Sequence, residues 1–179
     1  MPVEPQIIVR AAPQEFICRP GSWGSLEQHL QRRGIRRVLV LRGNRSWTAA
    51  APYWPELKET EVHYHVYSGE CSYRERDAIA GYASEHQLEA VIAVGGGKIT
   101  DLAKSAAARL NLPAIILPTL AATCAAWSSL SVMYDERGAF IRLAVVPWHD
   151  ALGLLGQAGV AASPLERLVA GIGDTLAKW

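Results

Sequence analysis

The sequence lacks three features that mark large classes of protein. Its three cysteines, Cys18, Cys71 and Cys124, are far apart and form no CxxC pair, so we expect neither a disulfide framework nor a zinc knuckle. It contains no run of about eighteen apolar residues, and its first residues do not read as an export signal, which argues against a membrane partner. These absences favour a cytoplasmic protein.

An excess of one charge is also missing. Eighteen basic and seventeen acidic side chains give a net charge of +1, whereas a surface that follows nucleic-acid phosphates concentrates basic residues. We therefore expect no nucleic-acid partner. The partners that we expect are a small-molecule substrate and further copies of the chain in a homo-oligomer.

What the sequence does contain is an alternation of short apolar runs with segments of helical period. This pattern predicts an α/β fold, Rossmann-like, with a mostly parallel sheet and helices on both faces. Strands are expected at 38–41, 61–67, 90–94 and 114–117, and a weaker one at 152–155. Two further short strands are expected at 7–10 and 16–19, but the sequence does not show which strands they pair with. Helices are expected at 23–33, capped by Ser22, at 72–87, at 98–110 and from 163 onward. The segments 130–134 and 139–143 flank a turn and predict a β-hairpin.

The strand at 90–94 runs directly into Gly95, Gly96 and Gly97, which open the next helix. Glycines let a ligand approach the backbone, and the free amides of a helix N-terminus attract phosphate. The stretch AVGGGKITDLAK matches neither GxGxxG nor GxxxxGK, so a plain strand-to-helix connection stays an alternative. Lys98 would be favourable beside a phosphate, and the sign of Asp101 suits a helix start. Their ordinary alternatives are a solvated lysine and simple helix capping.

Three stretches carry a family resemblance: AVGGGKITDLAKSAA, LPTLAATCAAWSSLSVMY and LLGQAGVAASPLERLVAGIGDTLAKW. They resemble the glycerol dehydrogenase branch of the iron-containing alcohol dehydrogenase superfamily. The sequence of residues 122–127, Ala-Thr-Cys-Ala-Ala-Trp, is more similar to the hydroxycarboxylate dehydrogenase-like members of this superfamily. The match is nearly ungapped over residues 90–179 and looser before them.

The resemblance implies an oxidoreductase that uses NAD(P) and a divalent metal (Zn, Fe or Mn) on the CH–OH group of a small alcohol or hydroxycarboxylate. It implies contacts to the cofactor by Gly96, Gly97, Lys98, Asp101, Thr119 after Pro118, Thr123, Ser128, Leu130 and Tyr134. Without the resemblance, Leu130 and Tyr134 read equally well as core residues. Asp174 matches one metal ligand of the family. Cys124 stands where glycerol dehydrogenases carry a substrate-contacting aspartate, which argues against a polyol substrate.

The resemblance also divides the chain. Residues 1–163 match the nucleotide-binding domain, and residues 164–179 match the first helix of a C-terminal, metal-binding helical domain that the sequence does not otherwise contain. No histidine stands at the place of a family ligand, so we expect the chain alone to have no dehydrogenase turnover. His63 and His65 share a strand face and form a weaker metal candidate. The competing interpretations are a catalytically inactive dinucleotide-binding module and a dehydroquinate synthase-like lyase.

The choice between cofactors depends on the residues that follow the strand at 38–41. An acidic residue there binds the ribose hydroxyl of NAD, and a basic one accommodates the phosphate of NADP. The chain has Arg42, Asn44 and Arg45, and related glycerol dehydrogenases carry an aspartate near Asn44. We therefore expect Asn44 to face the adenosine end, and NADP, or both cofactors, to bind. The alternative is that both arginines are solvated and the adenosine is recognised elsewhere.

Overall fold

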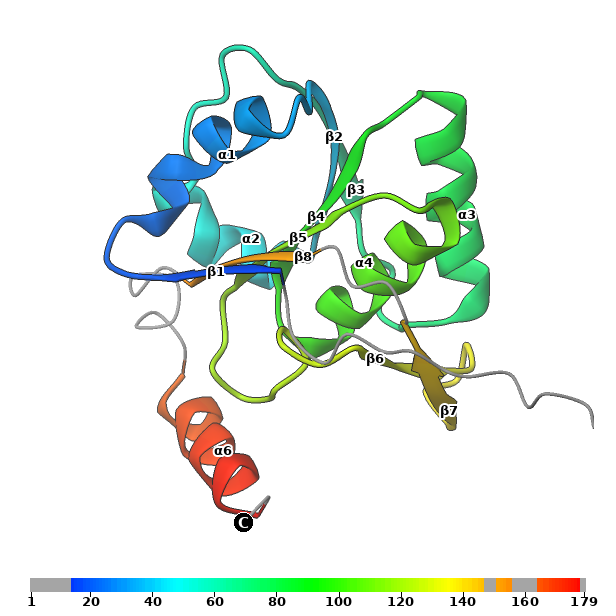
Figure 1. Ribbon diagram of the computed structural model, residues 1–179. Helices are drawn as coiled ribbons and strands as arrows, with labels where there is room; N and C mark the ends of the chain where they lie inside the picture. Colours follow the sequence, from blue (N-terminus) through cyan, green and yellow to red (C-terminus); the bar gives the residue numbers. More distant parts are fainter. Residues whose placement is uncertain (1–13, 147–150, 156–163, 178–179) are drawn as a thin grey trace, which may run out of the picture.

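A parallel sheet forms the centre of the protein in the computed structural model, which describes residues 14–146, 151–155 and 164–177 (Figure 1). Its order is β1-β8-β5-β4-β2-β3, and every described pairing in it is parallel. The strands are β1 (Glu15–Cys18), β2 (Arg37–Arg42), β3 (Glu61–Val66), β4 (Ala90–Gly95), β5 (Ala114–Pro118) and β8 (Ala151–Leu155). The predicted Rossmann-like α/β fold is confirmed.

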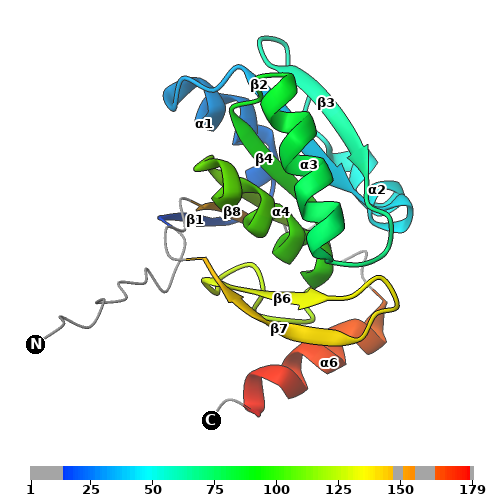
Figure 2. The same ribbon diagram turned by 90° about the vertical axis from the view of Figure 1, so that its right-hand side faces the viewer.

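Helices cover both faces of this sheet (Figure 2). One face carries η1 (Ser22–Ser25), α1 (Leu26–Arg32), α2 (Asn44–Ala50) and η2 (Ala51–Tyr53), and the other carries α3 (Tyr73–Glu85) and α4 (Gly97–Leu110). In β2, Val38 and Val40 pack on the α1 side, whereas Leu39 and Leu41 pack on the α3 and α4 side. Strands buried on both faces need an unbroken apolar run, which is why the central strands could be recognised in the sequence.

Local signals set several helix ends. The Ser72 hydroxyl accepts a hydrogen bond from the Glu75 amide at 3.2 Å, so it caps α3. Gly34, with a φ of +70°, follows α1 and ends it. The expected cap at Ser22 is wrong, because Ser22 lies in the 3₁₀ turn and its buried hydroxyl has no partner among the described residues. Helix α1 begins three residues beyond the predicted start, at Leu26.

A two-stranded antiparallel ribbon lies apart from the main sheet, beside α4 (Figure 2). Its strands β6 (Leu130–Tyr134) and β7 (Phe140–Val145) confirm the predicted hairpin, and Gly138 in the turn has a φ of +82°. Several hydrogen bonds tie β6 to the body, and two of them come from its middle and its end. The Ser131 hydroxyl donates to the Asp101 carbonyl at 2.9 Å, and the Tyr134 amide donates to the Cys71 carbonyl at 2.9 Å.

Two parts of the chain differ from the expectation. The strand expected at 16–19 is β1, and its neighbour is β8, while the segment 7–10 lies outside the described residues. Residues 44–50, for which no helix or strand was predicted, form α2, whose first residue is Asn44. This helix is short and has little apolar periodicity, because Ala50 is its one fully buried residue. At its start the Ser46 hydroxyl accepts a hydrogen bond from the Gly43 amide at 3.0 Å.

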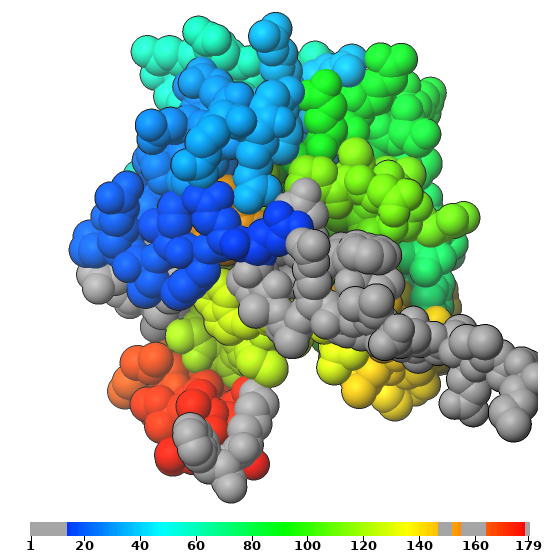
Figure 3. Space-filling view, in the orientation of Figure 1, coloured from blue at the N-terminus to red at the C-terminus, as the bar shows by residue number. Residues whose placement is uncertain are grey.

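The last described element is α6 (Leu165–Leu176), preceded by Pro164, and it confirms the predicted final helix. In space-filling view it projects as a lobe from the lower part of the body (Figure 3). Leu165, Val169 and Leu176 are among its large exposed apolar side chains. Across the described ranges, no helix combines the length and apolarity that a membrane span requires.

Candidate functional site

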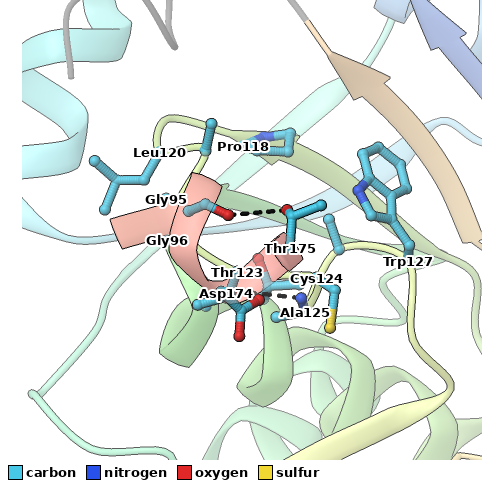
Figure 4. A pocket seen from close by; sticks show the side chains of 15 residues that line it. Gly95, Gly96, Pro118, Leu120, Thr123, Cys124, Ala125, Trp127, Asp174 and Thr175 are labelled. Carbon is cyan, nitrogen blue, oxygen red and sulfur yellow. Dashed lines mark hydrogen bonds between the residues drawn. The ribbon is translucent and has the colours of Figure 1, made fainter. Parts of the chain in front are cut away.

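A pocket of about 390 Å³ opens at the carboxyl ends of β4 and β5 (Figure 4). It is enclosed by the start of α4, the loop of residues 119–129 and one side of α6. Its lining residues are Gly95, Gly96, Gly97, Thr100, Pro118, Leu120, Ala121, Thr123, Cys124, Ala125, Ala126, Trp127, Gly171, Asp174 and Thr175. Open α/β sheets bind their ligands at this edge.

The three consecutive glycines have two different uses. A Cβ at Gly95 would lie 2.5 Å from the Ile99 side chain, so this glycine permits close packing of α4 on β4. Gly96 and Gly97 instead face the pocket: a Cβ would lie 3.0 Å from Leu120 at the first and 3.1 Å from the Thr123 hydroxyl at the second. Their bare backbone leaves a cradle that side chains would narrow.

The cradle is electrostatically suited to an anion. It lies at the N-terminus of α4, where first-turn amides have no intrahelical acceptor and the helix dipole is positive. The first turn of α4 contains no acidic side chain. A pyrophosphate is a ligand of matching charge and size for such a site.

The loop of residues 119–129 forms the wall opposite α4. The Thr119 amide donates to the Gly95 carbonyl at 3.1 Å, which ties the end of β5 to the end of β4. Thr119 itself is buried and does not line the pocket. Thr123 does line it, and its hydroxyl accepts weakly from the Ala125 amide at 3.4 Å (Figure 4).

Asp101 lies beneath the pocket rather than in its wall. Its Oδ1 lies 2.9 Å from the Lys104 Nζ, and its Oδ2 accepts from the Val132 amide at 3.1 Å. Burial raises the pKa of Asp101 and lowers that of Lys104, while the attraction between the two charges opposes both shifts. In the structure Asp101 therefore forms a buried ion pair with Lys104, whereas we expected it to contact the cofactor.

Lys104 is the residue that shapes the loop from below. Its ammonium group donates to the carbonyl oxygens of Ala125 at 2.7 Å and Ser128 at 3.1 Å, and also to that of Leu130. The side chain is completely buried. One cation thus gathers three backbone carbonyls from the segment that carries Cys124 and Trp127.

Several expected cofactor contacts lie outside the pocket lining in the described structure. Lys98 is exposed at the start of α4, where its Nζ forms an ion pair with Glu70 and lies 5.0 Å from the centre of the Tyr134 ring. The Ser128 hydroxyl donates to the Leu130 carbonyl at 3.4 Å. Asn44 is exposed at the first turn of α2, beyond the carboxyl end of β2.

Asp174 and Cys124 both line the pocket, from α6 and from the loop (Figure 4). A Cβ at Gly171 would lie 1.7 Å from the Ala121 carbonyl oxygen, so α6 packs with its backbone directly on the loop. This contact brings Asp174, one turn further along, to the pocket. The Thr175 hydroxyl donates to the Gly171 carbonyl at 2.9 Å within the same helix.

The described residues do not bring a metal-ligand set together around Asp174. Among the described residues, no three His, Cys, Asp or Glu side chains lie close enough together to hold a metal ion. His63 contacts Tyr82 and Glu61, and His65 contacts Glu75, all away from the pocket.

Sequence reasoning missed the residues that support the pocket: Leu120, Lys104, Trp127 and Gly171. The spacing of Asp101 and Lys104 in the sequence could have suggested their ion pair. The Trp127 ring had no such signal. It lies against Gly153, where a Cβ would come within 2.5 Å of the ring, and its centre is 4.4 Å from that of Phe16.

Comparisons with known proteins agree with this geometry. The family model described as iron-containing alcohol dehydrogenase matches residues 13–147. Hydroxycarboxylate dehydrogenase A of Escherichia coli K12 is 34% identical over 180 residues, covering 100% of this chain and 49% of that protein. Glycerol dehydrogenase of Thermotoga maritima is 33% identical over 168 residues, covering 93% of this chain and 46% of that protein.

A solved structure is similar as well. The probable glycerol dehydrogenase from Sinorhizobium meliloti 1021 superposes with a TM-score of 0.84 at 32% identity, covering 96% of this chain and 47% of that one. The chain thus spans about half the length of the curated relatives it matches. The family model and the relatives together confirm the resemblance, and the chain belongs to the iron-containing alcohol dehydrogenase family.

Proposed function

We propose that this chain is the dinucleotide-binding part of an NAD(P)-dependent dehydrogenase that interconverts a small alcohol or hydroxycarboxylate and its carbonyl form. In this proposal residues 1–163 form the nucleotide-binding domain, and residues 164–179 begin a helical domain. The observation that carries it is the bare cradle of Gly96 and Gly97 at the carboxyl ends of β4 and β5. The names of the relatives, which are dehydrogenases, support it.

NAD(P), when bound, would supply the nicotinamide that accepts or donates a hydride. The amides at the start of α4 would bind its pyrophosphate. Thr123 would limit the position of the phosphate, because its hydroxyl lies 3.1 Å from where a Gly97 Cβ would stand. The apolar side of Leu120 and the ring of Trp127 would exclude water from the remaining pocket wall.

A metal does not fit these residues on their own. Asp174 contributes a single carboxylate to the pocket, and catalytic zinc sites use three protein ligands. Since the described residues form no three-ligand group, we assign no step to a metal in this chain. Asp174 remains our candidate for one ligand of a site completed by other residues.

The pocket also supports a choice of substrate class. Cys124 is exposed in the wall shared with Asp174, at the place where the resemblance assigns an aspartate to glycerol dehydrogenases. Cysteine in place of aspartate removes from the pocket a carboxylate that would repel a substrate with its own carboxylate. We therefore favour a small hydroxyacid, such as a 2-hydroxyacid, over a polyol. Hydroxycarboxylate dehydrogenase A is among the relatives.

For the cofactor we favour NADP, or both dinucleotides. Arg42 ends β2 beside Gly43 and Asn44, and its guanidinium lies 5.1 Å from the Trp47 ring centre and 5.8 Å from that of Tyr64. The turn where a 2′-phosphate would bind therefore carries the Arg42 cation, and residues 42–44 include no carboxylate that would repel the phosphate.

The direct test is cofactor titration. NADPH and NADH fluorescence should report binding to the wild-type chain, and Gly97→Val should weaken it at least about tenfold, because the new side chain fills the cradle. Gly81→Val is the matched control, since nothing lies within 4 Å of a Cβ there. Thermal melts establish that both variants fold. Equal affinity for wild type and Gly97→Val would remove the phosphate-loop assignment.

A further inference from the structure

Lys98, the residue that follows the glycine cradle, is held by a carboxylate from another loop. Its Nζ lies 2.7 and 2.8 Å from the two oxygens of Glu70, which belongs to the connection between β3 and α3. The same Nζ lies 5.0 Å from the centre of the Tyr134 ring. Both charged side chains are partly exposed, at 46% for Lys98 and 27% for Glu70.

The pairing offsets an unfavourable local charge. A cation in the first turn of a helix opposes the helix dipole, so the start of α4 does not itself stabilise the charge of Lys98. Glu70 supplies the negative charge from outside the helix. A phosphate in the cradle of Gly96 and Gly97 would supply negative charge to the same region.

Glu70 is also held in place by its surroundings. A Cβ at Gly138, in the hairpin turn, would lie 3.3 Å from the Glu70 Oε1, so the turn backs the carboxylate. The next residue, Cys71, accepts at its carbonyl from the Tyr134 amide, and Ser72 forms a bridge with Tyr134. The hairpin turn at Gly138 and the backbone contacts with Tyr134 therefore hold the Glu70 segment from two sides.

We propose that Glu70 is a competing counter-ion for Lys98, which weakens dinucleotide binding and speeds its release. The inference rests on the proposed function, because it concerns the same cradle. When the pyrophosphate occupies the cradle, Lys98 either leaves Glu70 or is shared with it, and in both cases Glu70 repels the ligand. In many enzymes a release step, not the chemistry, limits turnover, so a fixed competitor of this kind would tune turnover rather than chemistry.

The test is a double-mutant cycle on the full chain with NADH and NADPH as probes. Glu70→Gln should tighten binding about three- to fivefold at low salt, the size expected for a partly exposed ion pair. It should lower the dissociation rate in stopped flow, and the gain should shrink as salt screens the charges. In a Lys98→Met background the gain from Glu70→Gln should fall markedly, because the competition is for Lys98.

Glu136→Gln is the matched control, since it removes the same charge from the exposed hairpin turn. It should leave binding within about twofold of wild type, as expected for a screened surface charge. Unchanged or weaker binding by Glu70→Gln, in a wild type that binds dinucleotide, would overturn this inference alone. A gain of equal size in the Lys98→Met background would also overturn it. A wild-type chain that binds neither dinucleotide would instead overturn the proposed function.

Discussion

The Asp101 Oδ1 lies 2.9 Å from the Lys104 Nζ inside the protein, directly below the wall of the candidate pocket. The Lys104 ammonium group also donates to the carbonyls of Ala125 and Ser128 in the loop that carries Cys124, and to that of Leu130 at the start of β6. A buried ion pair contributes little stability when compared with apolar residues, but removal of one partner leaves an uncompensated charge. This pair therefore fixes the shape of the loop more than it adds to the stability of the fold.

Lys104→Met should destabilise the chain by about 3–5 kcal/mol, because it leaves the Asp101 carboxylate and three carbonyls without their cation. Urea unfolding measures this loss. The Cys124 thiol should also react faster with a thiol reagent, since its loop is no longer gathered from below. Lys58→Met, at a side chain that is 70% exposed, is the control and should change stability by less than about 0.5 kcal/mol. A loss of similar size in both variants would contradict the assigned role.

Gly171→Ala should detach α6 from the loop, because even one methyl group would lie 1.7 Å from the Ala121 oxygen. Hydrogen exchange over residues 164–177 should then become faster. Gly173→Ala in the same helix is the matched control, since nothing lies within 4 Å of a Cβ there, and its helix should gain up to about 1 kcal/mol in propensity. If hydrogen exchange in α6 is equally slow in both variants, the packing of Gly171 on Ala121 does not hold the helix.

Asn44→Asp should shift cofactor preference towards NADH. A carboxylate at the first turn of α2 would repel a 2′-phosphate while it could accept from a ribose hydroxyl, so NADPH affinity should fall about tenfold and NADH affinity should not. Asn44→Ser keeps the site neutral and should preserve the wild-type ratio. Paired titrations of the two cofactors measure the change. A parallel loss of both affinities would mean that the adenosine end is recognised elsewhere.

Glu89 should make the stability of the chain sensitive to acid. The backbone amide of Arg36 donates to its carboxylate at 2.6 Å and that of Arg37 at 3.1 Å, and these bonds lower the pKa of Glu89 below its ordinary value of 4.5. A carboxyl whose pKa is lower in the folded state contributes stability above its unfolded pKa and loses it as pH falls through the folded pKa. Urea midpoints at neutral pH and below about pH 4 measure this contribution.

Glu89→Gln should therefore lower stability at neutral pH and flatten the acid dependence. Glu85→Gln, at an exposed residue of α3, is the control for the loss of a negative charge. A Glu89→Gln midpoint that falls as steeply with acid as the wild type would show that other carboxylates dominate.

The sequence allowed the central fold to be predicted because burial on both sheet faces leaves a simple mark. Residues 90–94 and 114–117 are unbroken apolar runs, and they are β4 and β5 with an added residue at the carboxyl end of each. The hairpin could be predicted for a similar local reason, since Gly138 takes the positive φ that its turn requires. Helix α2 could not, because its buried face is a single alanine, Ala50.

The candidate site was predictable where it depends on the local backbone and not where it depends on distant contacts. Gly96 and Gly97 could be recognised from the strand and helix that flank them. The competition for Lys98 could not, since Glu70 stands 28 positions away in the sequence. Asp101 was assigned to the pocket because its charge suits a helix start, but only the packing of β6 on α4 reveals that it is buried.

The pairing of β1 with β8 sets an order of assembly during synthesis. Glu15 aligns with Leu152, so β1, the first of the described strands, finds its neighbour only after the other described strands of the sheet have been made. Strands β2 to β5 pair among themselves and can fold earlier, whereas closing so long a loop is a slow step. The centre of the Phe16 ring in β1 lies 4.4 Å from that of the Trp127 ring, so β1 adds this support to the pocket wall at the same moment. A nascent chain would acquire its fold before it acquires a finished binding site.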